Sequence, residues 1–274
     1  ILNGTTNYIL TKMSRDGSSY EEVLKEAQQL GYAERNPEAD VEGYDACRKI
    51  AILTSLAFGS TVNYEDVCTE GITKISTEDF AYAEKIGCVV KLLATSKKIN
   101  DKVYAITAPF LIEKEHPLYN VNDVLNGIYI KGNVIGDVMF FGAGAGKLPT
   151  ASAVVADVVD CVKHKGKNVM TVWSSEKIEL GNVEDVERYF FVRVKGSVDK
   201  DLSEVEKAFG DIDVVTVDGI DGEFGFVTSL MTEKAFNAAA ANVEVINRIR
   251  IDTISGLADS TPNNIRVCRN EDWK

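Results

Sequence analysis

The stretch from Gly31 to Lys49 constrains the fold most, because it must end one helix and begin another within a short space. Its sequence is GYAERNPEADVEGYDACRK. The residue before a proline is driven out of the helical region of backbone space, so the chain cannot be regular helix at Asn36-Pro37. From about Val41 the pattern turns helical again, and Gly59 closes that helix. We therefore predict two helices separated by an acidic loop.

Acidic side chains gather in this loop, and the following helix pairs one of them with a lysine. Asp45 and Lys49 are four residues apart, so both lie on one face of the helix. On a solvated helix such an ion pair contributes only about 0.3–0.5 kcal/mol. This helix is otherwise apolar around most of its circumference, which predicts burial, and the loop adds Glu34, Asp40 and Glu42. Both interpretations stay open: an ordinary surface pair, or a partly buried pair that binds a zwitterion and transfers a proton.

The composition excludes several classes of protein. The net charge is −12, so no basic surface is available for nucleic acid or for an anionic membrane. No apolar run approaches the length of about 20 residues that spans a bilayer. The five cysteines include no CxxC pair and there are two histidines, so we expect no metal site. We therefore expect a reduced, cytoplasmic protein that acts on a small molecule.

The chain begins without methionine, at a sequence typical of the entry to a helix. Residues 3–7, NGTTN, form a polar turn before apolar residues, and we expect Thr5 or Thr6 to cap the helix. The first residues have neither the basic region nor the cleavage site of a signal peptide. We therefore expect a fragment whose upstream part has been removed.

The first 162 residues are predicted to be helices packed on a mostly antiparallel sheet. Expected helices cover residues 19–30, 41–58 and 76–86, and expected strands cover 88–95, 103–111 and 136–141. A glycine-rich loop, GAGAGKLPTAS at 142–152, leads into an apolar helix from Ala151 to Val162. Its GxGxG spacing and the missing GK[ST] ending do not fit a phosphate-binding loop. Close backbone packing and contact with a cofactor explain its glycines equally well.

The rest of the chain has a different pattern. Residues 163–186 are charged and polar, and we interpret them as a linker. A strand, a helix, two strands, a helix and a strand follow at 189–194, 200–209, 213–217, 225–231, 232–240 and 245–251. This βαββαβ order across residues 187–254 predicts a ferredoxin-like domain, and residues 255–274 form a polar, loosely ordered tail. The whole chain is therefore predicted to be α+β, with the helix-and-sheet domain first.

Four segments, taken in order, resemble homoserine dehydrogenase. They are ILNGTTNYIL at 1–10, GYAERNPEADVEGYDACRKIAILTSLAFG at 31–59, GITKIS at 71–76 and FFGAGAGKLPTASAVVADVVD at 140–160. The resemblance covers residues 1–162, and the βαββαβ segment resembles the ACT domain of many bacterial members. The family's N-terminal Rossmann domain is missing, because no strand–GxGxxG–helix unit with a following acidic residue occurs in the sequence.

The resemblance implies an oxidoreductase that interconverts L-homoserine and L-aspartate 4-semialdehyde with NADP or NAD, in threonine, methionine and isoleucine synthesis. It implies that Lys49 donates and accepts the proton, and that Gly31 and Gly146 lie beside the cofactor. The substrate-binding positions that it implies are Glu34, Asp45, Asp40, Tyr32 and Thr5. The family's sodium site would lie upstream of Ile1, so no metal ligand is expected in the chain. A homodimer or homotetramer is expected.

Two further expectations concern the chain as it stands. Without a cofactor-binding domain it is expected to be inactive alone, and the alternative is a catalytically silent module for oligomerisation and amino-acid binding. The turn at Lys195 to Lys200 lacks the D-x-P-G pattern of ACT effector sites. We therefore expect edge-to-edge pairing from the ACT-like segment, not threonine feedback.

Overall fold

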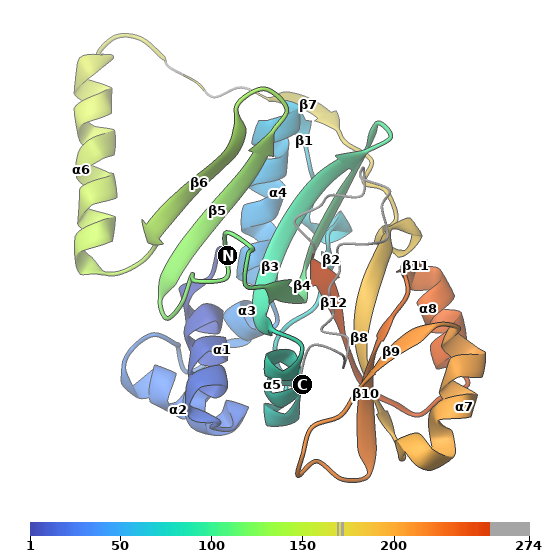
Figure 1. Ribbon diagram of the computed structural model, residues 1–274. Helices are drawn as coiled ribbons and strands as arrows, with labels where there is room; N and C mark the ends of the chain where they lie inside the picture. The colour runs from blue at the N-terminus through green and yellow to red at the C-terminus, as the bar shows by residue number, and fades with distance from the viewer. Residues whose placement is uncertain (169, 171–172, 253–274) are drawn as a thin grey trace.

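The computed structural model describes residues 1–168, 170 and 173–252, and the expected tail at 255–274 lies outside this range. Its centre is a long hairpin of β3 (Cys88–Ile99) and β4 (Lys102–Glu113) (Figure 1). Helices pack against this hairpin and each other: α1 (Gly4–Asp16), α2 (Tyr20–Gln29), α4 (Tyr44–Phe58) and α5 (Thr77–Lys85). Buried side chains such as Ile9, Ile50 and Leu92 form one core between helices and strands. This agrees with the predicted helices on a mostly antiparallel sheet.

The cap of α1 differs from the expected one. The side chain of Asn3 accepts a hydrogen bond from the Thr6 N–H at 2.9 Å, while Thr5 and Thr6 lie inside the helix. Asparagine is among the strongest N-cap residues, because its short side chain reaches an N–H two or three residues ahead. The expectation of a threonine cap was therefore wrong. α2 lies within the expected range 19–30, and a capping box of Ser19 and Glu22 begins it.

The helix expected from Val41 is broken in two. α3 (Glu38–Val41) ends before Gly43, and α4 begins at Tyr44. Gly43 has a φ of +82°, a left-handed conformation that interrupts a right-handed helix. One face of α4 is buried, but Ile52 and Leu56 on another face are 52% and 44% exposed. The prediction of a buried helix therefore holds for one face only.

One eight-stranded sheet contains strands from both the first part of the chain and the ferredoxin-like part. Its order is β2-β4-β12-β8-β10-β9, with β3 also pairing with β4 and β11 with β8. Besides β3 and β4, the sheet contains β2 (Cys68–Thr69), β8 (Glu187–Lys195), β9 (Ile212–Val215), β10 (Glu223–Thr228), β11 (Met231–Thr232) and β12 (Val245–Asp252). β12 runs parallel to β4 with Arg250 opposite Phe110, whereas β3–β4, β12–β8, β10–β8 and β10–β9 are antiparallel. The mixed, mostly antiparallel sheet matches the predicted fold class.

Residues 187–252 follow the predicted βαββαβ order, with the short β11 added before the second helix. Their helices are α7 (Val198–Phe209) and α8 (Glu233–Ala240), which pack on one face of the strands (Figure 1). Phe190, Phe226 and Phe236 lie in the core between them. Because β4 continues the sheet beyond β12, the ferredoxin-like part and the first part share one sheet.

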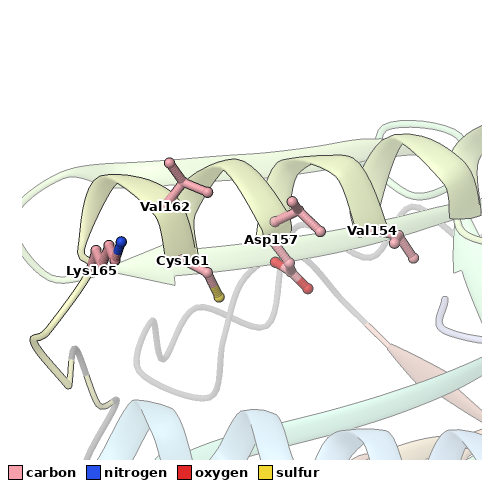
Figure 2. Close-up of a pocket in the computed structure, with 6 residues that line it drawn as sticks. Val154, Asp157, Cys161, Val162 and Lys165 are labelled. Carbon is pink, nitrogen blue, oxygen red and sulfur yellow. The ribbon is translucent and has the colours of Figure 1, made fainter.

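A second hairpin and a long helix lie beside this sheet (Figure 1). β5 (Leu125–Gly132) pairs antiparallel with β6 (Gly136–Ala143), and α6 (Lys147–Lys163) follows. α6 begins before the expected Ala151, because Pro149 falls in its first turn, where N–H groups have no intrahelical partner anyway. No residue of α6 is buried, and Val154 and Val162 project from it (Figure 2).

The segment at 163–186, expected to be a linker, contains two short elements. β7 (Ser174–Lys177) runs parallel to β1 (Ser60–Thr61), just after α4. The 3-10 turn η2 (Val183–Asp185) precedes β8, as η1 (Tyr64–Asp66) precedes β2. The segment therefore returns to the first part of the chain before the ferredoxin-like strands begin.

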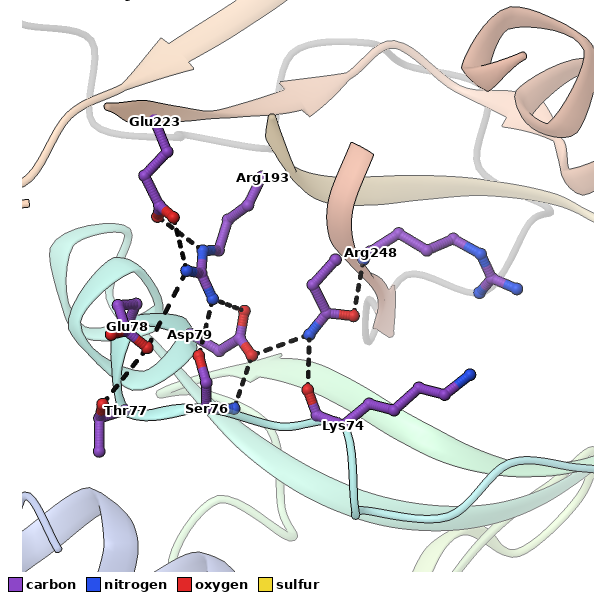
Figure 3. Close-up of polar contacts among 9 residues, drawn as sticks. Lys74, Ser76, Thr77, Glu78, Asp79, Arg193, Glu223 and Arg248 are labelled. Atoms are coloured by element: carbon purple, nitrogen blue, oxygen red, sulfur yellow. Dashed lines mark hydrogen bonds and ion pairs between the residues drawn. The ribbon is translucent and has the colours of Figure 1, made fainter. Parts of the chain in front are cut away.

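Buried ion pairs tie α5 to the ferredoxin-like strands (Figure 3). Arg193 on β8 donates to Asp79 at 2.9 Å and to Glu223 at 2.8 Å. Asn247 on β12 donates to the other oxygen of Asp79 at 2.8 Å. Burial alone would lower the pKa of Arg193, but the hydrogen bonds to Glu223 and Asp79 outweigh it and raise that pKa.

Candidate active site

Asn3, at the N-terminus of α1, joins two of the acidic residues expected to bind substrate. Its Nδ2 donates to Asp40 Oδ1 at 2.7 Å and to Asp45 Oδ2 at 2.9 Å. Its Oδ1 accepts from the N–H and the hydroxyl of Thr6 at 2.9 and 3.0 Å. Because donors occupy Oδ1, the amide nitrogen must face the two carboxylates. A buried, neutral amide therefore holds together one acid in α3 and one at the start of α4.

Lys49 forms the predicted ion pair with Asp45. Its Nζ lies 2.7 Å from Asp45 Oδ2 and donates to the Leu2 carbonyl at 3.0 Å. The side chains of Lys49 and Asp45 are 48% and 32% exposed. An ammonium group has three N–H donors, so one remains for an acceptor on a bound molecule. The lysine is thus accessible, while two protein groups fix its position.

Thr5, in the first turn of α1, contacts Tyr32 on the loop after α2. Thr5 Oγ1 donates to the Tyr32 carbonyl at 2.7 Å. The Tyr32 ring packs edge-on against Tyr8, with ring centroids 5.0 Å apart. Tyr8 donates to Glu26 at 2.8 Å, and burial followed by this hydrogen bond raises the pKa of Tyr8 to about 12. These contacts fix the loop after α2 against the first turn of α1.

Glu34 and Gly31 lie on that loop. The Glu34 side chain is exposed, and its backbone carbonyl accepts a hydrogen bond from Gln28 Nε2 at 3.1 Å. Gly31 has a φ of +76°, the left-handed conformation typical of a residue just after a helix. The space where a side chain would project from it is open. Both residues therefore face solvent, on the loop that carries Tyr32.

Gly146 lies on a separate segment, after the β5–β6 hairpin. It precedes the first residue of α6 with a φ of +113°. Within residues 1–168, 170 and 173–252, no hydrogen bond or ion pair joins it to the group around Lys49. The described contacts therefore gather Asp40, Asp45 and Lys49 in one cluster and Thr5 and Tyr32 in a neighbouring one, both at the start of α1.

Neither Asn3 nor the Leu2 carbonyl was predicted to belong to the site. The residue type of Asn3 and its place before a helix are the signal for an N-cap. Its contact with Asp40, 37 residues along the chain, has no such local signal.

The arrangement suits a small amino acid with a polar end group. Carboxylates attract an ammonium group, and a helix N-terminus attracts a carboxylate. In the described part of the chain, the N–H groups of Gly4 and Thr5 have no hydrogen-bond partner. Lys49 supplies a positive charge and a proton donor within the same surface. No described helix is long and apolar enough to cross a membrane, and no described cluster of His, Cys, Asp or Glu fits a metal.

Comparison with known proteins gives a consistent result. The family model described as homoserine dehydrogenase matches residues 1–159. Homoserine dehydrogenase of Synechocystis sp. is 53% identical over 166 residues, which are 59% of this chain and 38% of that protein. The crystal structure of a homoserine dehydrogenase from Thiobacillus denitrificans has 33% identity and a TM-score of 0.82, over 92% of this chain and 63% of that one. A hyperthermophilic archaeal homoserine dehydrogenase mutant in complex with NADPH has 31% identity and a TM-score of 0.50, over 62% and 48%.

The chain spans 38% of the length of the Synechocystis relative. The likeness to the Thiobacillus structure extends beyond residue 159 into the ferredoxin-like part, which the family model does not cover. Since the family model matches more than half of the 274 residues, the chain belongs to the homoserine dehydrogenase family.

Proposed function

We propose that this chain is the substrate-binding and proton-transferring part of an enzyme that interconverts L-homoserine and L-aspartate 4-semialdehyde. The observation that carries the proposal is the 2.7 Å contact of Lys49 with Asp45, beside Asp40 and the open N-terminus of α1. In the oxidative direction the alcohol carbon loses a hydride and the hydroxyl loses a proton. In the reductive direction the aldehyde carbon gains a hydride and its oxygen gains a proton.

Homoserine is a zwitterion, and the site offers a partner for each of its charges. Asp40, Asp45 and the exposed Glu34 are suited to the ammonium group. The N–H groups of Gly4 and Thr5 are suited to the carboxylate. The Thr5 hydroxyl holds the Tyr32 backbone at 2.7 Å and so keeps the loop that carries Glu34 beside the site.

Lys49 is the group that moves the proton. Two of its three N–H donors are directed to Asp45 and to the Leu2 carbonyl. The third is directed to the substrate oxygen, where it donates a proton to the forming alcohol and, as a neutral amine, accepts one in the reverse direction. Proton transfer from a positioned side chain contributes about 10²–10⁴-fold to a rate.

NADP or NAD, when bound, takes up or supplies the hydride. Gly31 fits a backbone contact with it, because this residue is exposed and has open space at its Cα. Gly146 fits a second contact at the N-terminus of α6. β6, the glycine-rich loop and α6 form a strand, loop and helix in that order. However, β6 belongs to an antiparallel hairpin, whereas a dinucleotide-binding fold uses a strand of a parallel sheet at this position. We therefore assign only these two backbone contacts to the described residues.

The enzyme is proposed to be a cytoplasmic homodimer or homotetramer that serves amino-acid biosynthesis. Four cysteines are free thiols among the described residues, which supports a reducing compartment. Phe140 and Phe141 on β6 are 62% and 58% exposed, which supports an assembly that covers them. The net charge of −12 supports a small-molecule partner over nucleic acid.

A steady-state assay tests the proposal. The complete gene product and the 274-residue chain alone are each mixed with L-homoserine and with NADP⁺ or NAD⁺, and reduced cofactor is followed by its absorbance. We expect turnover by the complete gene product and none by the chain alone. Failure of the complete gene product to turn over homoserine would overturn the proposal. Calorimetric binding of homoserine without turnover would favour the silent binding module instead.

A further inference from the structure

We infer that Asn3 is a positioning residue of this active site. Its carboxamide holds the carboxylates of Asp40 and Asp45 side by side and thereby sets the geometry of the Asp45–Lys49 pair. The inference rests on the function proposed above. It concerns a residue to which neither the resemblance nor that proposal gives a role.

All four hydrogen-bonding positions of the Asn3 amide are used. Its two N–H donors go to Asp40 and Asp45, and its oxygen accepts two hydrogen bonds from Thr6. The side chain is buried, so water does not compete for these contacts. An amide with every donor and acceptor occupied has one orientation, and that orientation fixes both carboxylates relative to α1.

The same contacts fix the proton-transferring lysine. Asp45 Oδ2 receives both the Asn3 amide at 2.9 Å and Lys49 Nζ at 2.7 Å. Lys49 also donates to the carbonyl of Leu2, the residue before Asn3. Asn3 therefore holds Asp45, and the preceding residue, Leu2, holds Lys49. A shift at Asn3 would displace Asp45 and Lys49 together.

A neutral double donor is also what two neighbouring carboxylates require. Asp40 and Asp45 repel each other when both are ionised, and one N–H to each offsets that repulsion. An acid at position 3 would add a third negative charge to the pair. A hydroxyl would supply one donor at most and would be too short to bridge two oxygens.

Capping and positioning can be separated by substitution. Serine and aspartate cap helices about as well as asparagine does, so Asn3→Ser and Asn3→Asp both preserve the start of α1. Neither provides the two N–H donors. A role in capping alone predicts wild-type activity in both folded variants, whereas a role in positioning predicts that both lose activity while they remain folded.

The experiment measures kcat, KM for homoserine and melting temperature in the complete gene product. We expect kcat/KM to fall about 10- to 100-fold in Asn3→Ser, the range for losing hydrogen bonds to charged groups, and further in Asn3→Asp. Both kcat and KM should change, because Asp40 faces the substrate ammonium and Asp45 faces Lys49. The melting temperature shows whether each variant is folded at the assay temperature; it should fall modestly in Asn3→Ser, because the hydrogen bonds to Asp40 and Asp45 are lost, and further in Asn3→Asp, which adds a negative charge.

Asn182→Ser is the matched control. Asn182 is exposed, and its side chain accepts from the Glu184 N–H at 3.0 Å to cap η2 in the same way. Its kcat/KM should equal that of wild type. If wild type turns over homoserine and Asn3→Ser or a folded Asn3→Asp does so equally well, this inference is overturned and the proposed function stands. If wild type shows no turnover, the proposed function falls, and the inference falls with it.

Discussion

The carboxylate of Asp79 lies 2.9 Å from the guanidinium of Arg193, and both side chains are buried where α5 meets β8 (Figure 3). The two residues are 114 positions apart and belong to the two parts of the chain that share one sheet. Removing one partner of a buried ion pair is costly, because no water replaces the lost contact, although Arg193 would keep its hydrogen bonds to Glu223. This contact therefore makes the stability of one part depend on the other.

Replacing Asp79 by alanine should strongly destabilise the whole chain. Removing one partner of a buried pair costs about 3–5 kcal/mol. Urea unfolding of Asp79→Ala should show this loss in a single transition. Glu244→Ala is the control, because Glu244 and Lys195 form a pair that is 70% and 63% exposed, and its loss should cost less than about 1 kcal/mol. Equal losses of unfolding free energy in the two variants would contradict a stabilising role for the buried Asp79–Arg193 contact.

Acid should weaken the fold between about pH 4 and pH 2 through Asp252. Burial alone would raise the pKa of this carboxyl, but the hydrogen bond from His116 and the charge of Lys97 outweigh it and lower the pKa to about 2. The folded pKa is below the ordinary value of 3.8, so the stabilisation is complete above that value and is lost as pH falls towards 2. The melting temperature of Asp252→Asn should therefore depend less on pH in this window. Asp213→Asn, an exposed carboxyl on β9, should keep the wild-type dependence.

Lys91 should also make stability rise with pH, but in a window at alkaline pH. Its ammonium is buried and donates to the Val121 carbonyl at 2.6 Å and to Asn122 at 2.9 Å, and burial lowers its pKa from 10.5 to about 8. Between these two values the unfolded chain binds more protons than the folded one, so stability from this group rises with pH. Lys91→Met should lose that rise and should cost about 1–3 kcal/mol, because it leaves buried acceptors unpaired. An unchanged slope between pH 8 and 10 in chemical denaturation would contradict this account.

Local features of the fold were predictable because each depends on residues a few positions apart. The capping box of Ser19 and Glu22 and the left-handed Gly31 follow from side-chain reach and backbone freedom alone. The break at Gly43 was not predicted, because the apolar pattern runs on through it. The parallel pairing of β12 with β4 could not be predicted either, because Arg250 and Phe110 are distant in sequence and pair only in the folded chain.

In the site, too, the contacts between residues close in sequence were predictable, and those that depend on tertiary structure were not. The Asp45–Lys49 contact follows from the four-residue helical spacing. The exposure of Lys49 does not, because it depends on what covers that side of α4. The part played by Asn3 depends on how α1 is oriented towards a loop formed much later in the chain, which no local rule specifies.

Replacing Lys49 by alanine should lower kcat by about 10²–10⁴-fold in the complete gene product, because the substrate oxygen loses its proton donor. The fold should be retained, since the side chain is 48% exposed. Arg48→Ala is the neighbouring control: its guanidinium lies 5.6 Å from the centre of the Tyr64 ring, away from the acidic cluster. A Lys49→Ala enzyme that keeps more than about a tenth of kcat would remove this lysine from proton transfer.

Glu34 should act in binding and not in the chemical step. Its exposed carboxylate has no side-chain hydrogen bond within the described residues, so it is available for the substrate ammonium without breaking an existing contact. Glu34→Gln keeps the shape and removes the charge, and it should raise KM for homoserine with a smaller change in kcat. Glu38→Gln removes another exposed charge, at the first residue of α3, and should leave KM unchanged. Equal rises of KM in both variants would mean that the loop attracts substrate by its total charge, and that Glu34 makes no specific contact.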